Sequence, residues 1–281
     1  MTHRRIAAAV ALTWTMTLAP ANAQAPAAAI KPTEVIKLFD GKSLSNFETW
    51  LVDHHANDPE RVFTVVDQID GAPAIRVSGQ VWGGILTKQA YRDYRLIVEF
   101  RWGGATWGNR KDRARDSGVL LHAQGRLGNT GKDFNGPWLR SIEFQIIEGG
   151  VGDILPVAGY EQDGTQVRPS VTTTTRKDRN NETVYDEKGT LNTLSGGRIN
   201  WWGRSEDWAD KLGFRGSQDV ESPGLEWTRI EAVVEGGKLT YYVNGKLVNA
   251  ASDSSFKEGR IMIQSEGAEI YFRRIELQPL R

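Results

Sequence analysis

After residue 33, hydrophobic and polar residues alternate with a period of two over several stretches of the chain. The clearest alternation lies in residues 94–101, 229–235, 239–243, 259–264 and 270–277. Successive side chains of a β-strand point to opposite faces of a sheet, so this pattern predicts strands with one buried face. Asn244-Gly245, which precedes a further short strand at residues 246–248, signals a two-residue hairpin turn. The pattern therefore predicts an all-β fold.

The stretch from Asp116 to Glu148 carries the clearest functional signal. A strand-like run at residues 116–122 is followed, after a Gly-rich loop, by Ser-Ile-Glu-Phe-Gln-Ile-Ile-Glu. At a period of two, the hydrophobic residues of this second run face one way, while Glu143 and Gln145 face the other. A row of carboxylate and amide groups on a sheet with an apolar back is how a β-sandwich builds a carbohydrate cleft, and we expect such a cleft here.

Between Asp153 and Leu225 the alternation breaks down. This region is rich in Thr, Asn, Asp, Gly and Trp and has no sustained apolar period, which predicts long excursions over the sheet rather than a second core. Loops this long in a compact domain are usually functional or disordered. Its three tryptophans, Trp201, Trp202 and Trp208, favour an ordered and functional segment.

The N-terminus predicts export. A basic start, an apolar run at residues 6–19 and the small residues Ala21-Asn22-Ala23 have the form of a signal peptide over residues 1–23. The alternative, a membrane anchor, fits less well because the apolar run is short. An Ala/Pro-rich linker over residues 24–32 precedes one domain at 33–281. We expect a periplasmic or secreted protein.

Composition narrows the possible partners. The chain has no cysteine, which excludes disulfides, a thiolate nucleophile and a lipoprotein anchor. Its 35 basic and 35 acidic residues give no electrostatic case for nucleic acid or an anionic membrane surface. Ten tryptophans exceed what a core requires, so we expect some to stack on a small carbohydrate in a cleft. The oligomeric state stays open.

One glycosidase motif almost fits the polar row. Laminarinase-type glycosidases carry Glu-x-Asp-x-x-Glu on a strand, with two carboxylates set for retaining hydrolysis. Here the same spacing reads Glu143, Gln145 and Glu148, so an amide replaces the central carboxylate. An amide cannot ionise and cannot tune the protonation of its neighbours, which disfavours conventional hydrolysis of unoxidised glucosides by Glu143 and Glu148.

Several motifs in sequence resemble one known family, the 3-keto-disaccharide hydrolase-like family, over residues 34–280. They lie at residues 38–44, 94–100, 116–119, 142–146, 227–231, 242–246, 259–264 and 272–277. The resemblance implies a concanavalin-like jelly-roll β-sandwich with long loops over its concave face. The chain departs from the family at His122, where an arginine is more usual, and in the length and tryptophan content of residues 153–225.

The resemblance also implies a reaction. A ketone at C3 of a sugar acidifies the C2 hydrogen, so a base can remove it, and the aglycone at C1 then leaves by β-elimination. Hydration of the product completes a net hydrolysis. The route needs a base, a cationic or hydrogen-bonding group at the enolate oxygen, and a proton donor.

We assign these roles first to Glu143, His122 and Arg101, and expect their side chains and that of Gln145 to meet in one open trough. Residues expected to bind substrate are Gln145, Arg140, Glu148, Trp102, Trp107, Trp201 and Trp202. Each has a structural alternative: His122 can be a core histidine and Arg101 one half of an ion pair. Either Glu143, Glu148 or His122 can be the base.

No cofactor is expected, although a divalent metal could polarise the substrate. Asp116, His122, Glu143 and Glu148 are chemically suitable ligands without a metal-binding spacing, and Asp116 can instead cap a turn. The alternative function is a non-catalytic, lectin-like carbohydrate-binding module of the same fold. In that case Trp102, Trp107, Trp201 and Trp202 would stack on sugar without turnover.

Overall fold

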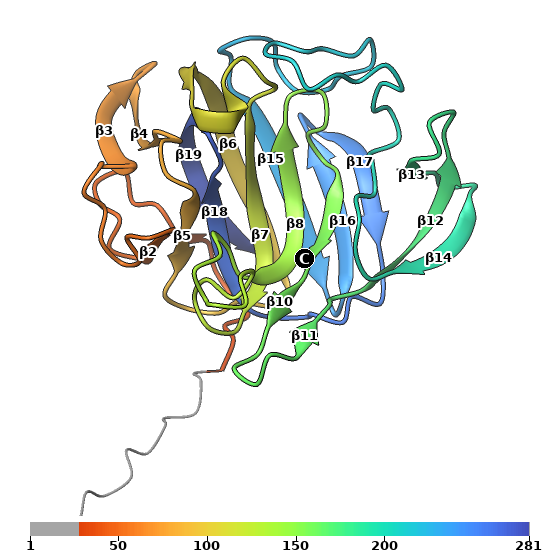
Figure 1. Ribbon diagram of the computed structural model, residues 1–281, viewed down its shortest axis with the longest axis horizontal. Coiled ribbons are helices and arrows are strands. Elements are labelled where there is room, and N and C mark those ends of the chain that lie inside the picture. Colours follow the sequence, from red (N-terminus) through yellow and green to blue (C-terminus); the bar gives the residue numbers. More distant parts are fainter. Residues whose placement is uncertain (1–27, 281) are drawn as a thin grey trace, which may run out of the picture.

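The computed structural model describes residues 28–280, which form a sandwich of two antiparallel sheets (Figure 1). The larger sheet has the order β17-β16-β15-β6-β19-β4-β3, and β1 also pairs with β19. Its strands are β1 (Ile36–Lys37), β3 (Phe63–Ile69), β4 (Ala72–Val77), β6 (Tyr94–Thr106), β15 (Thr228–Glu235), β16 (Lys238–Val243), β17 (Lys246–Ala251) and β19 (Ala268–Pro279). The predicted all-β sandwich is confirmed.

The second sheet has six strands in the order β2-β5-β18-β7-β8-β9. They are β2 (Phe47–Leu51), β5 (Gly83–Thr87), β7 (Asp116–Gln124), β8 (Arg140–Ile147), β9 (Ile154–Val157) and β18 (Arg260–Ser265). A 3-10 turn, η1 (Gly108–Arg110), lies between β6 and β7. Among the described residues, no helix has the length and apolar character needed to cross a membrane.

The core lies between the two sheets, where the hydrophobic faces of the alternating strands meet. Val119 of β7 pairs with Phe144 of β8, and both are fully buried. The Phe144 ring stacks on Tyr241 of the opposite sheet with ring centroids 4.1 Å apart. The core faces therefore match the predicted parity, which leaves Glu143 and Gln145 on the outer face of the six-stranded sheet.

The hairpin predicted at Asn244-Gly245 is confirmed, since β16 and β17 pair across it and both residues have positive φ angles of 48° and 79°. In contrast to the irregular excursion predicted after Asp153, the four threonines at residues 172–175 lie in a strand, β12 (Val171–Lys177). β-Branched side chains favour extended backbone, and β12 pairs with two neighbours.

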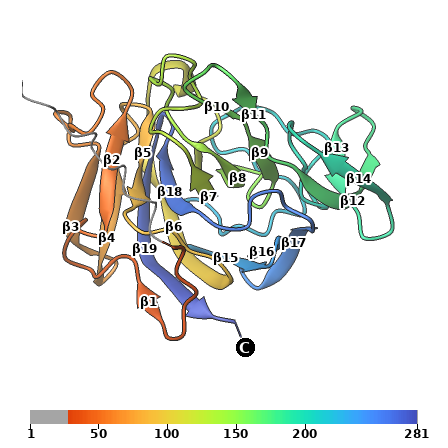
Figure 2. The same cartoon turned by 90° about the horizontal axis from the view of Figure 1, so that it is seen from below.

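The long excursion forms two small sheets and an irregular loop. One sheet pairs β10 (Gly159–Tyr160) with β11 (Gln166–Val167), and the other has the order β13 (Thr183–Tyr185), β12, β14 (Thr190–Leu194). Figure 2 shows the three-stranded sheet beside β9 and β17 at one side of the sandwich. The irregular loop continues from residue 195 to 227. The predicted signal peptide and the linker up to residue 27 lie outside the described residues.

Candidate active site

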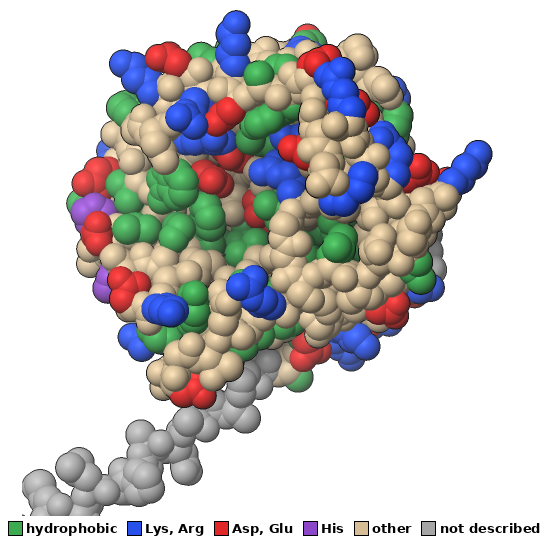
Figure 3. All heavy atoms as spheres, turned by 45° about the vertical axis from the view of Figure 1, so that its right-hand side comes forward, with side chains coloured by type: hydrophobic (Ala, Val, Ile, Leu, Met, Phe, Trp, Pro, Cys, Tyr) green, Lys and Arg blue, Asp and Glu red, His purple; other side chains and the backbone are tan. Residues whose placement is uncertain are grey.

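The outer face of the six-stranded sheet carries two adjacent rows of side chains across its central strands. In one row Gln264 of β18, Gly118 of β7 and Gln145 of β8 are neighbours, because Gly118 pairs with Gln145 and Ile263 pairs with Val119. In the next row, Glu143 lies opposite Leu120. Figure 3 shows a hollow on one face of the molecule, with acidic, basic and hydrophobic side chains around it.

Gly118 leaves room at the centre of this face. A methyl group added there would collide with the Oε1 atoms of both Glu143 and Gln264, so these two side chains lean over the glycine from either side. Glu143 and Gln264 are buried, yet Glu143 Oε1 and both polar atoms of Gln264 have no hydrogen-bonding partner in the described part of the chain. Buried polar groups are nearly always paired, so the missing partners mark this place as a candidate site.

Burial raises the pKa of Glu143 to about 8, and the negative charge of Asp116 adds to the effect while Arg198 opposes it. Burial likewise raises the pKa of Asp116 to about 7, although Arg110 and Arg198 act in the opposite direction. A carboxyl group with a pKa near neutrality can both accept and return a proton under ordinary conditions.

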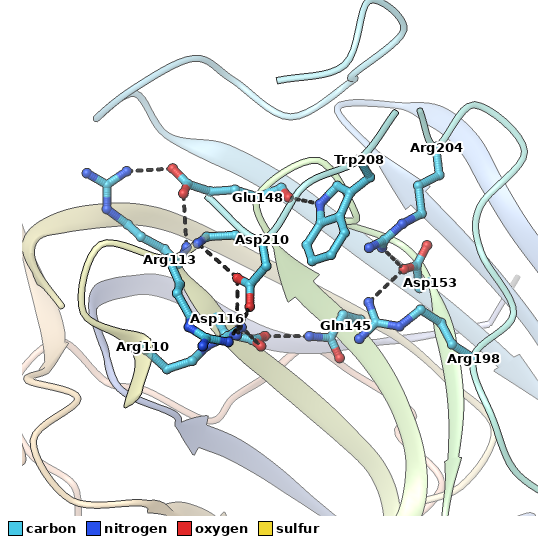
Figure 4. A network of polar contacts seen from close by, with 12 residues as sticks. Arg110, Arg113, Asp116, Gln145, Glu148, Asp153, Arg198, Arg204, Trp208 and Asp210 are labelled. Atoms are coloured by element: carbon cyan, nitrogen blue, oxygen red, sulfur yellow. Dashed lines mark hydrogen bonds and ion pairs between the residues drawn. The ribbon is translucent and has the colours of Figure 1, made fainter. Parts of the chain in front are cut away.

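Asp116 is held in place from both sides, as Figure 4 shows. Its Oδ1 atom accepts a hydrogen bond from Gln145 Nε2 at 2.5 Å, and its Oδ2 atom pairs with Arg110. Arg110 also lies 3.2 Å from Asp210 of the long loop. Gln145 therefore orients Asp116 beside Glu143, while Arg110 connects this pair to the loop.

Arg198, from the long excursion, is the cation that faces this cluster. Its guanidinium donates to Asp153 Oδ2 at 3.0 Å, and the same carboxylate also pairs with Arg204 (Figure 4). Burial opposes ionisation of Arg198, but Asp153, Asp116 and Glu143 together raise its pKa above the ordinary value. The side chain of Arg198 remains 31% exposed, so it is open to a ligand as well as anchored.

Glu266, in the turn between β18 and β19, is the third carboxyl group of the cluster. It is partly exposed. Burial and then the charges of Asp116 and Glu143 raise its pKa well above the ordinary value. A carboxylic acid that stays protonated at neutral pH can donate a proton.

Arg101 and His122 do not reach this cluster, so the expected meeting of residues 101, 122, 143 and 145 is wrong for these two. Arg101 lies on β6 of the other sheet, alternating with core residues, and pairs with Asp70 at 2.5 Å. His122 has a positive φ of 55° in a bulge of β7, which turns its ring into the core. There its Nδ1 lies 2.9 Å from Phe256 O, and burial lowers its pKa to about 4.

Arg140 and Glu148 lie on the same strand as Glu143 or just beyond it, but each is bound elsewhere. Arg140 lies two residues before Ile142 on β8, so its side chain leaves the strand on the same face as Ile142. It pairs with Glu161 at 2.5 Å. Glu148, one residue after β8, accepts from the Arg115 guanidinium at 2.6 Å and from two backbone N–H groups. The structure thus gives Glu148 partners for both oxygens, whereas the buried Oε1 of Glu143 has none in the described residues.

The four tryptophans expected to bind substrate are dispersed. Trp102 and Trp201 are buried in the core cluster. Trp107 is 39% exposed, and its Nε1 donates to Ser78 O just after β4. Trp202 is 41% exposed and lines a cavity of about 470 Å³ with Arg176 and Tyr185 of the small sheet. In the described residues, none of the four forms a hydrogen bond with Glu143 or Gln145.

The suggested metal ligands do not form a cation site. In residues 28–280, no group of three or more His, Asp or Glu side chains is arranged to hold a metal ion. Of the four proposed ligands, Asp116 and Glu143 lie in the cluster, while His122 points into the core and Glu148 is bound to Arg115. The expectation that no cofactor is needed, with a divalent metal as the alternative, stays a prediction.

Sequence reasoning missed Arg198, Gln264 and Glu266. Gln264 could have been found, since it alternates with Ile261 and Ile263 and so had to leave the core. Arg198 follows Gly196-Gly197 in an aperiodic region, and its approach to the sheet depends on the bridge between Ile199 and Ile154. No local pattern predicts that bridge.

Comparison with known protein families shows to which family the chain belongs. The model of the 3-keto-alpha-glucoside-1,2-lyase-like domain matches residues 34–278. The chain belongs to this family. The family resemblance expected from the sequence is therefore confirmed. A comparison with curated proteins gives no match.

Solved structures with a similar arrangement are carbohydrate-related. A putative glycosyl hydrolase from Parabacteroides distasonis is 15% identical, with a TM-score of 0.48, covering 88% of this chain and 94% of its own. The carbohydrate-binding module CBM66 from Bacillus subtilis is 12% identical (TM-score 0.42; coverage 82% and 94%). A Bacillus licheniformis beta-glucanase is 11% identical (TM-score 0.40; coverage 87% and 97%). Likeness at this level does not assign an activity.

Proposed function

We propose that the protein cleaves the glycosidic bond of 3-keto-glycosides, including 3-keto-disaccharides, by removing the C2 proton, eliminating the aglycone and hydrating the product. The observation that carries the proposal is the Glu143 carboxyl group. It is buried on the outer face of the sheet, has a free oxygen and lies beside Arg198, in a chain of the lyase-like family.

Glu143 is the proposed base. It takes the proton from C2, and the C–H electrons form a C2–C3 double bond with negative charge on the C3 oxygen. Burial in the cleft makes the ionised carboxylate a stronger base, which matches the weakly acidic hydrogen next to a ketone.

Arg198 and Gln264 are the proposed partners of the enolate oxygen. Arg198 supplies a positive charge that is already anchored by Asp153, and Gln264 supplies an amide N–H without another acceptor. Preorganised donors of this kind stabilise charge that develops in the transition state. Arg198 takes the role that the sequence suggested for Arg101.

The enolate then collapses: the C3 carbonyl re-forms, a C1–C2 double bond forms and the aglycone oxygen leaves C1. We assign Glu266 as the proton donor to this oxygen, because it is partly exposed and holds its proton. Water adds across the C1–C2 double bond, placing a hydroxyl on C1 and a proton on C2. Asp116 and Gln145 act as positioning residues beside Glu143.

The compartment is proposed from the leader sequence. A signal peptide at residues 1–23 would deliver the mature domain to the periplasm or the medium, where small carbohydrate substrates are available.

The test uses a glucoside and its 3-keto counterpart, each incubated with the wild type and with Glu143→Gln, with and without a chelator. We expect turnover of the 3-keto substrate alone, and a fall in kcat of about 10²- to 10⁴-fold in Glu143→Gln. Turnover of the unoxidised glucoside would favour the conventional glycosidase. Binding without turnover would favour the carbohydrate-binding module, and loss of activity with chelator would establish a metal.

A further inference from the structure

A cavity of about 380 Å³ lies in the long excursion, and Arg198 is part of its lining. Its walls come from the three-stranded sheet and from the irregular loop that follows it. We call it the cationic cavity. The residues of its lining that carry the argument below are Lys177, Glu182, Arg198, Asn200, Arg204 and Trp208.

Positive charge is in excess around this cavity. Lys177, Arg198 and Arg204 line it, whereas Glu182 is the one carboxylate among the described residues of its lining. Arg198 and Arg204 also share the buried carboxylate of Asp153, as Figure 4 shows. A single carboxylate cannot neutralise two guanidinium groups, so an excess of positive charge remains even when Asp153 is counted.

The carboxylate of Glu182 does not compensate a cation directly. Its Oε2 atom accepts a hydrogen bond from the side-chain amide of Asn200 at 2.6 Å. The ammonium group of Lys177 likewise donates to two uncharged acceptors, Asn181 O at 3.1 Å and Thr183 Oγ1 at 3.0 Å. An ammonium group has three N–H donors, so Lys177 keeps one for a ligand.

Arg204 supplies a second donor without an acceptor. The residue is only 8% exposed, and its Nε atom has no hydrogen-bonding partner in the described part of the chain. Its guanidinium lies over the ring of Trp208, 4.4 Å from the centroid, which holds the plane of the group in place. Hydrogen bonds from a cation to an anion are about twice as strong as those between neutral groups, so these donors favour a charged ligand over a neutral one.

The cationic cavity adjoins the proposed reaction centre through Arg198, the proposed partner of the C3 oxygen. In a 3-keto-disaccharide the second ring is attached at C1, two carbons from C3. A ring at this position lies within reach of the cavity when the C3 oxygen contacts Arg198. The volume is also in the range of sites that hold small ligands, roughly 300–1,000 Å³.

Resting on the proposed function, we propose that the cationic cavity is a subsite for an acidic sugar residue, one that carries a carboxylate or a sulfate group. The preferred substrates are then 3-keto-disaccharides whose second ring is acidic.

The first experiment measures binding without turnover. Calorimetric titrations of the wild type use free glucuronate and glucose 6-sulfate as acidic probes and glucose as the neutral one. We expect both acidic sugars to bind roughly 10-fold or more tightly than glucose, and their affinity to fall as salt is raised. The tighter of the two identifies the preferred anion. Equal affinity for glucose and the acidic sugars would overturn the subsite.

Two variants change the charge of the cavity in opposite directions. Lys177→Met should weaken glucuronate binding roughly 3- to 10-fold, because it removes a cation and keeps the length of the side chain. Glu182→Gln removes the carboxylate but keeps an oxygen that can accept from Asn200, and should tighten binding roughly 2- to 5-fold. Lys188→Met is the matched control, since Lys188 lines the separate cavity beside Trp202. It should match the wild type.

Kinetics connect the subsite to the reaction. In the wild type, KM for a 3-keto-glucosyl-glucuronate should be roughly 3- to 10-fold lower than for a 3-keto-glucosyl-glucose. Lys177→Met should remove most of this difference and leave both kcat values within about twofold.

Failure of the subsite and failure of the proposed reaction give different results. If the wild type turns over neither disaccharide but binds glucuronate in a Lys177-dependent manner, the subsite stands and the proposed reaction falls. Turnover of both disaccharides with equal KM, or the same loss of glucuronate affinity in Lys188→Met, would overturn the subsite. If Lys177→Met does not fold, Glu182→Gln decides, and unchanged glucuronate affinity in that variant would overturn the subsite.

Discussion

The outer faces of the two sheets carry similar alternating charges, but they treat their carboxylates differently. On the eight-stranded sheet, the acidic side chains meet arginines from neighbouring strands, as in Arg76–Glu269 at 2.7 Å and Arg273–Glu99 at 2.8 Å. On the six-stranded sheet, Glu143 is buried with one oxygen free. The first face is a paired, solvated surface, and the second holds a buried carboxyl group whose pKa is raised to about 8, so that it keeps its proton at neutral pH.

The difference comes from what lies above each face. The excursion brings Arg198 and Asp210 over the six-stranded sheet, where burial raises carboxyl pKa values. The eight-stranded sheet has no comparable cover in the contacts of residues 28–280, so its ion pairs stay near water and contribute little each. The strands of both sheets show the same alternation of polar and hydrophobic residues. Only the covered face of the six-stranded sheet, however, has the buried carboxyl groups with raised pKa values that the proposed reaction needs.

The test of this contrast with the largest expected effect replaces one arginine on each face by methionine, in two separate variants. Arg198→Met removes the proposed partner of the enolate oxygen and should lower kcat for a 3-keto-glycoside about 10²- to 10³-fold. Arg101→Met removes the pair with Asp70 and the contact with the Trp227 ring, both on the eight-stranded sheet, and should leave kcat within about twofold of the wild type. Steady-state kinetics on both variants decide the matter, and a larger loss in Arg101→Met would reverse the assignment of the two faces.

A smaller effect is expected from filling the space under Glu143. Gly118→Ala places a methyl group against Glu143 and Gln264, and should reduce kcat/KM on the order of 10-fold, because a small displacement of catalytic groups is costly. Gly104→Ala is the matched control: its new methyl group meets nothing within 4 Å. Equal kinetics for the two variants would show that the space above Gly118 is not used.

The pH dependence of stability provides a third test. Because the pKa of Glu143 is about 8 in the folded state against an ordinary 4.5, the folded protein binds more protons between these values, and stability falls as pH rises through that window. Glu143→Gln removes this contribution. Relative to the wild type, it should gain on the order of 1–3 kcal/mol between pH 4.5 and pH 8.5, measured by urea unfolding. Parallel pH profiles of the two proteins would contradict a raised pKa.

The same ionisation predicts a rise in kcat/KM of the wild type as pH increases toward 8, since the base must lose its proton before it can act. A profile already flat from pH 5 would remove Glu143 from that role.

The smallest effect is expected on the solvated face. Asp70 accepts from Arg101 and from Trp227 Nε1 at 2.8 Å, yet its side chain is half exposed. Asp70→Asn should leave both melting temperature and kinetics unchanged within error, as measured by calorimetry and steady-state assays. A clear loss of activity would indicate that this face takes part in catalysis.

Much of the fold could be predicted from the sequence, because parity within a strand follows from the backbone alone. The alternation of residues within β8 correctly predicted that Glu143 and Gln145 lie on an outer face. Alternation does not determine which sheet a strand joins, and Arg101 was therefore assigned to the wrong face. The prediction also assumed an unbroken strand, and the bulge at His122 reversed the direction of that side chain.

The remaining part of the site depends on contacts between distant segments. Arg198 reaches the cluster through Asp153, which lies 45 positions earlier in the chain. Ion pairs of this kind carry no periodic signal, so no local pattern predicts them. The sequence therefore located one side chain of the candidate site, Glu143, but the residues around it could be found only in the folded structure.

Asp153 connects strand β8 with the excursion that covers the six-stranded sheet. Its carbonyl oxygen accepts from Gln145 N at 3.1 Å, while its carboxylate accepts from Trp201 N and pairs with Arg198 and Arg204 of the excursion. If the excursion opens locally before the sandwich melts, Arg198 departs while the sheets survive. Mild denaturant would then abolish turnover in molecules that still give a full β-sheet spectrum.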